Sequence, residues 1–218
     1  SVRVLVAVAL GTSAFSMQDI LLEPYGAEIL KLTVGQTTAL TAFFALGTLA
    51  GFGLAARTLG RNADPYRIAG FGAVAGVFAF AAVIFAAPLG SVLLFRIGTA
   101  LIGFGGGLFA AGTLTAAMAI AAEGESGLAL GTWGAVQATA AGSGIALGGG
   151  IRDAVTSLAS SGELGRALTD PSTGYSVVYH IEIALLFATL VAIGPLVRSA
   201  RTGFSQPSTK FGLAEFPG

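Results

Sequence analysis

Four ionisable side chains stand inside long apolar segments of this sequence, where burying a charge costs at least a few kcal/mol. They are Asp19, Arg96, His180 and Glu182. At a rise of about 1.5 Å per residue from the outer helix ends, Asp19 lies roughly 7 Å deep, Arg96 roughly 9 Å and Glu182 roughly 12 Å. Opposite charges at similar depth on three helices predict an intramembrane charge network or a substrate site. The alternative for Arg96 and Asp19 is extension of the side chain to the outer headgroups.

The only histidine could bind a metal ion through a neutral imidazole. The alternative for His180 is a hydrogen-bonded packing residue. Trp133 and Gln137 share one helix face, and Gln137 must find a partner across the bundle or on a ligand. The sequence has no Ser/His/Asp set, no metal-ligand spacing and no carboxylate pair with a nearby base, so we expect no enzyme.

These residues would be held by six long apolar segments. A membrane-spanning helix needs about 20 mostly apolar residues. The segments cover approximately residues 2–24, 34–57, 66–88, 90–121, 126–151 and 174–198. An outer loop over 152–173 separates the last two, its 153–168 stretch could form a short surface helix, and 202–218 is expected as a cytoplasmic tail. The sequence predicts an all-α integral membrane protein, a six-transmembrane-helix bundle.

Composition supports a bilayer environment. Hydrophobic residues make up 54% of the chain and charged residues 10%, whereas about a quarter of the residues of a soluble domain are charged. The net charge of zero leaves no basic surface for nucleic acid, and the absence of cysteine excludes disulfides and thiolate metal sites. Glycines recur four residues apart, which is typical of close helix packing in lipid. The pairs are Gly47/Gly51, Gly72/Gly76, Gly103/Gly107, Gly127/Gly131 and Gly144/Gly148.

The basic residues predict that both termini are cytoplasmic, because Lys and Arg in short loops concentrate on that side. With the N-terminus inside, three basic residues fall outside, namely Lys31, Arg152 and Arg166. Seven fall inside, namely Arg3, Arg57, Arg61, Arg67, Arg198, Arg201 and Lys210. The inner loop around Glu123 and Glu125 has no positive charge, but acidic residues weigh little in this rule.

Several motifs resemble one family of membrane proteins. The first segment ends in Ser16-Met-Gln-Asp-Ile-Leu-Leu-Glu-Pro-Tyr-Gly26, and the fifth carries Gly131-Thr-Trp-Gly-Ala-Val-Gln-Ala-Thr-Ala-Ala141. The sixth carries Tyr179-His-Ile-Glu-Ile-Ala-Leu-Leu-Phe187. Up to about Arg201 the chain resembles the C-terminal half of the PucC/LhaA proteins, the bacteriochlorophyll-delivery branch of the major facilitator superfamily.

The resemblance implies one six-helix half of a major-facilitator-type fold and a role in assembling bacterial light-harvesting complexes. We expect a non-enzymatic scaffold in the bacterial inner or intracytoplasmic photosynthetic membrane that contacts light-harvesting polypeptides, the reaction-centre–antenna core, bacteriochlorophyll, or several of these. The candidate pigment- or partner-binding residues are His180, Glu182, Trp133 and Gln137, with His180 able to ligate a chlorophyll magnesium. A half alone would leave a face for the missing N-terminal half or for another membrane protein.

Two alternatives remain open. A secondary transporter half could move a small solute by alternating access, with Asp19, Arg96 and Glu182 as coupling or substrate groups. The chain could also be a permanent subunit of a reaction-centre–antenna supercomplex. Scarcity of charge near the bilayer midplane favours the scaffold.

Overall fold

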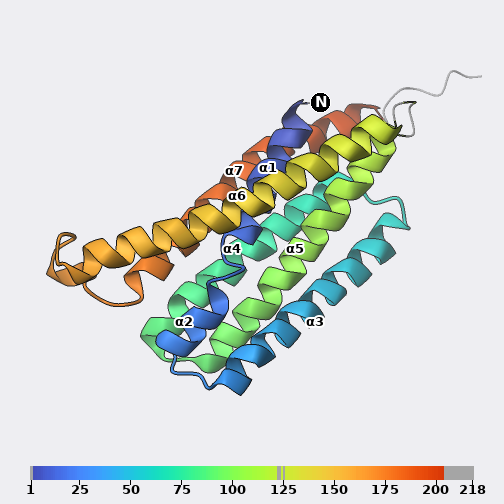
Figure 1. Cartoon of the computed structure of the whole chain (residues 1–218). Coiled ribbons are helices and arrows are strands. Elements are labelled where there is room, and N and C mark those ends of the chain that lie inside the picture. Colours follow the sequence, from blue (N-terminus) through green and yellow to red (C-terminus); the bar gives the residue numbers. More distant parts are fainter. Residues whose placement is uncertain (1, 122–123, 125, 204–218) are drawn as a thin grey trace, which may run out of the picture.

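The computed structural model describes residues 2–121, 124 and 126–203, and these residues are almost entirely helical. Figure 1 shows an elongated bundle with α3 along one edge and the α6–α7 connection projecting beyond the other helices. The helices are α1 (Val2–Ser16), α2 (Leu22–Glu28), α3 (Val34–Leu59), α4 (Pro65–Leu89), α5 (Val92–Ile120), α6 (Ser126–Ser160) and α7 (Thr173–Gly203), with a 3₁₀ turn over Arg166–Leu168.

Four of the described helices are long and apolar enough to cross a membrane: α3, α4, α5 and α7. They coincide with four of the six predicted segments. The two other segments appear as α1, which has only 15 residues, and as α6, which has 35 residues but does not reach the same apolar character. Residues 204–218 of the expected tail, together with Glu123 and Glu125, lie outside the described residues.

The first predicted segment differs from the expectation of one helix over 2–24. Helix α1 ends at Ser16, and the chain makes turns over residues 17–21 before α2 begins at Leu22. Pro24 lies in the first turn of α2, where its missing N–H leaves no hydrogen bond unmade. The Gln18 side chain donates through Nε2 to the carbonyl of Phe15, at 2.9 Å, and so satisfies one carbonyl at the end of α1.

The break is held in place by an aromatic core. The Tyr25 ring of α2 packs against Phe95 of α5 and against Tyr175 and Tyr179 of α7, with ring centroids 5.3–5.4 Å apart. The Tyr25 hydroxyl also donates to the carbonyl of Val83 in α4, at 3.1 Å. Contacts to three helices therefore anchor the short α2 segment after the turn.

The fifth predicted segment continues further than expected. Helix α6 does not end near residue 151 but extends to Ser160, so part of the expected loop and surface helix is one helix with the segment before it. The first residue that favours a helix stop is Gly162, with φ of 79°. Arg152 on this extension donates from Nη1 to the Tyr175 hydroxyl, at 2.9 Å, and ties it to α7.

Glycines form the contact between α3 and α5. A Cβ atom at Gly47 or Gly51 would collide with the backbone of α5, and one at Gly103 or Gly107 would collide with the backbone of α3. The two helices approach closely because neither carries a side chain there. The pairs Gly72/Gly76 and Gly144/Gly148 also meet neighbouring helices, whereas Gly127 and Gly131 on α6 have nothing within 4 Å among the described residues.

Candidate functional site: a helix break and an outward-facing histidine

Asp19 and Glu182, two acidic residues expected at similar depth in the membrane, lie near each other at the helix break. Glu182 on α7 is fully buried, and Asp19 in the turn after α1 is close enough for the two charges to repel. Neither oxygen of the Glu182 carboxyl has a hydrogen-bond partner among the described side chains. The backbone N–H of Gln18 lies near this carboxyl group without forming a hydrogen bond to it.

Two more buried polar groups at this break lack partners, and the sequence analysis did not single them out. Gln18 is 1% exposed, and its Oε1 atom has no hydrogen bond among the described residues. The hydroxyl of the fully buried Tyr179 lies near Glu182 and is likewise unpaired there. Gln18 stands one residue before Asp19, and Tyr179 stands three residues before Glu182. This closeness in sequence to the two acidic residues is the signal that could have identified them.

Arg96 does not join this acidic group. Its guanidinium lies over the ring of Phe43 on α3, with 5.9 Å from Cζ to the ring centroid. Within the described residues the one ion pair joins Arg152 to Asp153, and none involves Arg96. The structure thus brings Asp19 and Glu182 together and turns Arg96 toward another helix.

His180 lies on the outer surface of α7 and is exposed. Its Nδ1 atom is 2.6 Å from the backbone oxygen of Ser176, one helical turn earlier. A carbonyl oxygen can only accept, so this contact places the ring proton on Nδ1 and leaves the lone pair on Nε2. Among the described residues, Nε2 has no hydrogen bond.

A pocket of about 600 Å³ opens beside His180. Its walls combine polar and apolar side chains, among them Leu168, Asp170, Ser176 and Ala184. Two hydrogen bonds from Ser172, one from its backbone N–H and one from its hydroxyl, hold the pKa of Asp170 below its ordinary value. The Asp170 carboxyl group is therefore ionised at neutral pH, and its hydrogen bonds stabilise the turn before α7.

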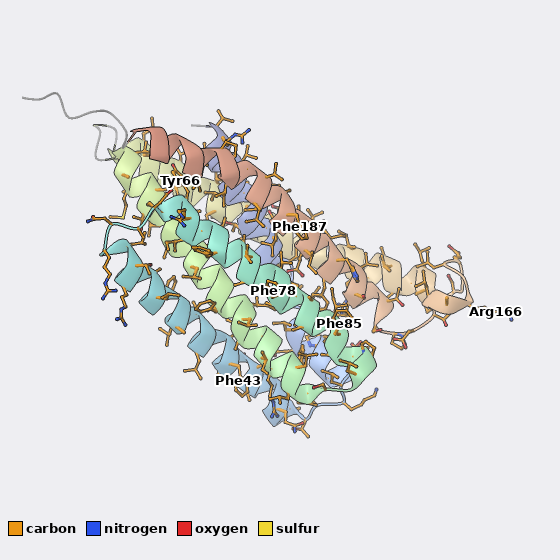
Figure 2. All side chains as sticks on the ribbon, turned by 180° about the vertical axis from the view of Figure 1, so that it is seen from behind. Phe43, Tyr66, Phe78, Phe85, Arg166 and Phe187 are labelled. Atoms are coloured by element: carbon orange, nitrogen blue, oxygen red, sulfur yellow. The ribbon has the colours of Figure 1, made fainter. Side chains whose placement is uncertain are left out.

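The surface next to this pocket is aromatic. On α4 the side chains of Phe71, Phe78 and Phe85 are 57–67% exposed and recur every seven residues. On α7 Phe187 is 55% exposed, seven residues after His180. Figure 2 shows Phe78, Phe85 and Phe187 along the adjoining α4 and α7. We call this surface, formed by these four phenylalanines and His180, the aromatic face.

Trp133 and Gln137 lie elsewhere. The indole Nε1 of Trp133 donates to the hydroxyl of Thr113 on α5, at 3.3 Å. Trp133 also lines a groove of about 180 Å³ together with Val4 and Leu5 of α1. The Gln137 side chain is half-buried and makes no hydrogen bond to the described residues. The structure therefore separates Trp133 and Gln137 from the pocket at His180.

Four apolar helices of spanning length and a polar group buried at a helix break define a multi-pass membrane protein. The chain belongs to the PUCC protein family, whose model matches residues 1–201. It is 50% identical over 220 residues to an uncharacterized protein in the puhA-bchM intergenic region of Rhodobacter capsulatus, a match that covers all of this chain and 46% of that protein.

Other relatives also match this chain over less than half of their own length. The chain is 48% identical to Protein PucC of Cereibacter sphaeroides, over 90% of this chain and 42% of that protein. It is 30% identical to the bacteriochlorophyll synthase 44.5 kDa chain of Rhodobacter capsulatus, over 93% of this chain and 46% of that one. The chain thus spans about half the length of the curated relatives it matches. No solved structure matches it.

Proposed function

We propose that this chain is part of a non-enzymatic membrane assembly factor for bacterial light-harvesting complexes, which holds bacteriochlorophyll on the aromatic face. His180 would bind the pigment magnesium through Nε2. Antenna polypeptides, the reaction-centre–antenna core, or both, would receive the pigment from this face.

The observation that carries the proposal is the orientation of the His180 ring. Histidines that bind metals almost always donate their other ring N–H to an oxygen acceptor, which fixes the tautomer. The 2.6 Å contact from Nδ1 to the Ser176 carbonyl supplies that acceptor, and Nε2 of the exposed His180 has no hydrogen bond to the described residues. A packing histidine would be expected to form hydrogen bonds to neighbouring helices through both ring nitrogens.

The surroundings of His180 fit a large flat ligand. The adjoining pocket of about 600 Å³ lies within the range of 300–1,000 Å³ that is typical of small-molecule sites. Ile183, Ala184 and Phe187 follow on the same helix and offer an apolar wall for a macrocycle. Bound bacteriochlorophyll would supply a magnesium ion, which the His180 imidazole would hold while this wall packs against the macrocycle.

The names of the relatives support the biological setting. One relative is named as a chain of bacteriochlorophyll synthase, and others are named PucC. We place the chain in the bacterial inner or intracytoplasmic photosynthetic membrane with both termini cytoplasmic. The start of α1 and the end of α7 lie at one end of the bundle, which also holds the α3–α4 connection (Figure 1). Arg61 lies in this connection, Arg57 near the end of α3 and Arg67 near the start of α4. One such end rich in basic residues is what the positive-inside rule requires.

A reconstitution experiment tests the pigment site. The chain is placed in nanodiscs and titrated with bacteriochlorophyll, and binding is followed by the absorption and fluorescence of the pigment. The variant His180→Leu should bind at least tenfold more weakly, because it keeps apolar bulk and loses the ligand. In His180→Gly, added imidazole should occupy the space of the missing side chain and restore pigment binding.

A matched control separates the ligand from its surroundings. Ser160→Ala removes an exposed hydroxyl on α6, outside the pocket at His180, so its pigment affinity should equal that of the wild type. Wild-type affinity in His180→Leu would refute the ligand role. Loss of folded protein in both His180 variants, without rescue by imidazole, would identify a packing histidine.

Two further measurements address the alternatives. Solute uptake driven by a proton gradient in proteoliposomes would favour a transporter half. Stoichiometric co-purification with the mature reaction-centre–antenna complex would favour a permanent subunit, whereas transient association during assembly supports the proposal.

A further inference from the structure

A second pocket, of about 300 Å³, opens between the helix break and α3. Two carboxyl side chains, Asp19 and Glu23, line it, and the Thr41 hydroxyl donates to Glu23 Oε1 at 3.0 Å. The rest of the wall is largely apolar and includes Leu22, Leu40 and Phe44. We call this site the acidic pocket.

One wall residue of the same pocket carries a buried acceptor without a partner. Both hydrogens of the Gln18 amide are used, since Nε2 lies 2.9 Å from the Phe15 carbonyl and 2.8 Å from Asp19 Oδ1. These two acceptors fix the orientation of the amide, so the opposite atom must be Oε1. That oxygen is buried and unpaired among the described residues, although Gln18 is a wall residue of the pocket. An unpaired buried acceptor calls for a donor from outside the chain.

The negative charge around this pocket has no counter-charge in the described structure. Asp19 also acts electrostatically on the buried carboxyl group of Glu182, so a third acidic side chain lies near this pocket. Arg96 is directed to Phe43, and the one ion pair within the described residues lies at Arg152. Oxygen acceptors thus accumulate at a site with few donors and low polarity, where a positive group would be strongly attracted.

The chemistry of the wall separates an organic cation from a metal ion. The described residues contain no group of three or more His, Cys, Asp or Glu side chains arranged to hold a metal. Leucine side chains and the ring of Phe44 instead suit a charged group that is carried on a short apolar chain, because an aromatic face attracts cations.

We propose that the acidic pocket binds one organic cation, an ammonium or guanidinium group on a short apolar chain, with Asp19 and Glu23 as its charge partners and Gln18 Oε1 as an added acceptor. The proposal is independent of pigment binding, because His180 faces a different pocket.

Calorimetric titration of the chain in phosphatidylglycerol nanodiscs tests this site. The probes are n-butylammonium and n-butylguanidinium, with neutral n-butanol as the matched control. Both cations should bind, and n-butanol should not. The variants Asp19→Asn and Glu23→Gln should each weaken cation binding about tenfold or more, because hydrogen bonds between charged groups are roughly twice as strong as those between neutral groups. Glu163→Gln, at an exposed position between α6 and α7, should bind as the wild type does.

A further variant tests the site without changing a charge, in case the charge variants fail to fold. Phe44→Leu keeps every carboxyl group and should weaken n-butylguanidinium binding several-fold through loss of the aromatic face. Equal binding of n-butanol, undiminished binding in the double variant Asp19→Asn/Glu23→Gln, or displacement of both probes by Mg²⁺ or Na⁺ at equal concentration would overturn the proposal.

The same titration in phosphatidylethanolamine nanodiscs distinguishes two sources of the cation. A lower apparent affinity there would support the site and identify the lipid ammonium headgroup as its occupant. An unchanged affinity would support the site and assign it to a soluble amine or to a basic side chain of a partner.

Discussion

Replacing Glu182 by methionine should make the folded protein more stable. The carboxyl group is fully buried, and neither of its oxygens has a hydrogen-bond partner among the described side chains. An unsatisfied buried polar group costs about 1–3 kcal/mol. Methionine has a similar length and an adaptable thioether, so it can fill the space without a polar atom that needs a partner.

The magnitude follows from that cost. Recovering about 1–3 kcal/mol would raise the melting temperature by about 2–4 °C for each kcal/mol in a chain of this size. The single tryptophan, Trp133, provides a fluorescence signal for thermal unfolding in detergent. Glu182→Gln is the matched control, since an amide in the same place still has polar atoms to satisfy, and its gain should be smaller.

A lower melting temperature in Glu182→Met, with Glu182→Gln close to the wild type, would refute this reasoning. It would mean that the carboxyl group already has a partner in the membrane, such as a water molecule or a cation. A stabilised variant that no longer supports antenna assembly would show instead that Glu182 is retained for function at the expense of stability.

Two further predictions concern packing and pH. Gly103→Leu would place a side chain against the backbone of α3 and should destabilise the protein by about 1–3 kcal/mol, whereas Gly127→Leu, on the open face of α6, should change the unfolding temperature little. The Ser172 hydrogen bonds lower the pKa of Asp170 from 3.8, so their stabilisation is present above the unfolded-state pKa and is lost as pH falls through the lower folded-state pKa. Asp170→Asn, whose neutral amide accepts these bonds more weakly, should therefore raise hydrogen exchange at the Ser172 amide at pH 7, and the difference from the wild type should vanish below the folded-state pKa.

The four clearest helices could be predicted from the sequence because apolar composition and end signals agree there. The predicted 34–57 and 66–88 segments correspond to Val34–Leu59 and Pro65–Leu89. Thr33 caps the first of these through a capping box, and Asp64 accepts from the Tyr66 backbone N–H at the start of the second. Both are local interactions that the sequence encodes within a few residues.

The break after α1 could not be read from apolar composition. Hydropathy averages over a window, and the apolar residues on both sides of Gln18 and Asp19 keep that average high. The turn depends on a contact between the Gln18 side chain and the α1 terminus, and on Tyr25 packing against distant helices. Such long-range contacts decide whether a polar pair interrupts a helix or lies within it.

Counting residues placed Asp19, Arg96 and Glu182 at similar depths but could not give the direction of their side chains. Asp19 and Glu182 were expected at similar levels, and the structure brings them together. Arg96 was expected at that level too, but a residue count gives no rotation about the helix axis, and the side chain is turned toward Phe43. The tautomer of His180 was likewise beyond the sequence, because it depends on the approach of Nδ1 to the Ser176 carbonyl.

The distribution of satisfied polar groups indicates that the break is a working part of the protein. Buried threonines elsewhere pair locally: the hydroxyls of Thr99, Thr113 and Thr189 each donate to the carbonyl four residues earlier, at 2.7–2.9 Å. Single buried atoms without a partner also occur away from the break, at Arg96 Nε and Thr156 Oγ1. At the break, Gln18 Oε1 and both oxygens of the Glu182 carboxyl group have no hydrogen-bond partner among the described residues. These unpaired groups are all hydrogen-bond acceptors, and they lie near a pocket that the carboxyl groups of Asp19 and Glu23 line. Such an arrangement is expected where a protein keeps acceptors free for a ligand.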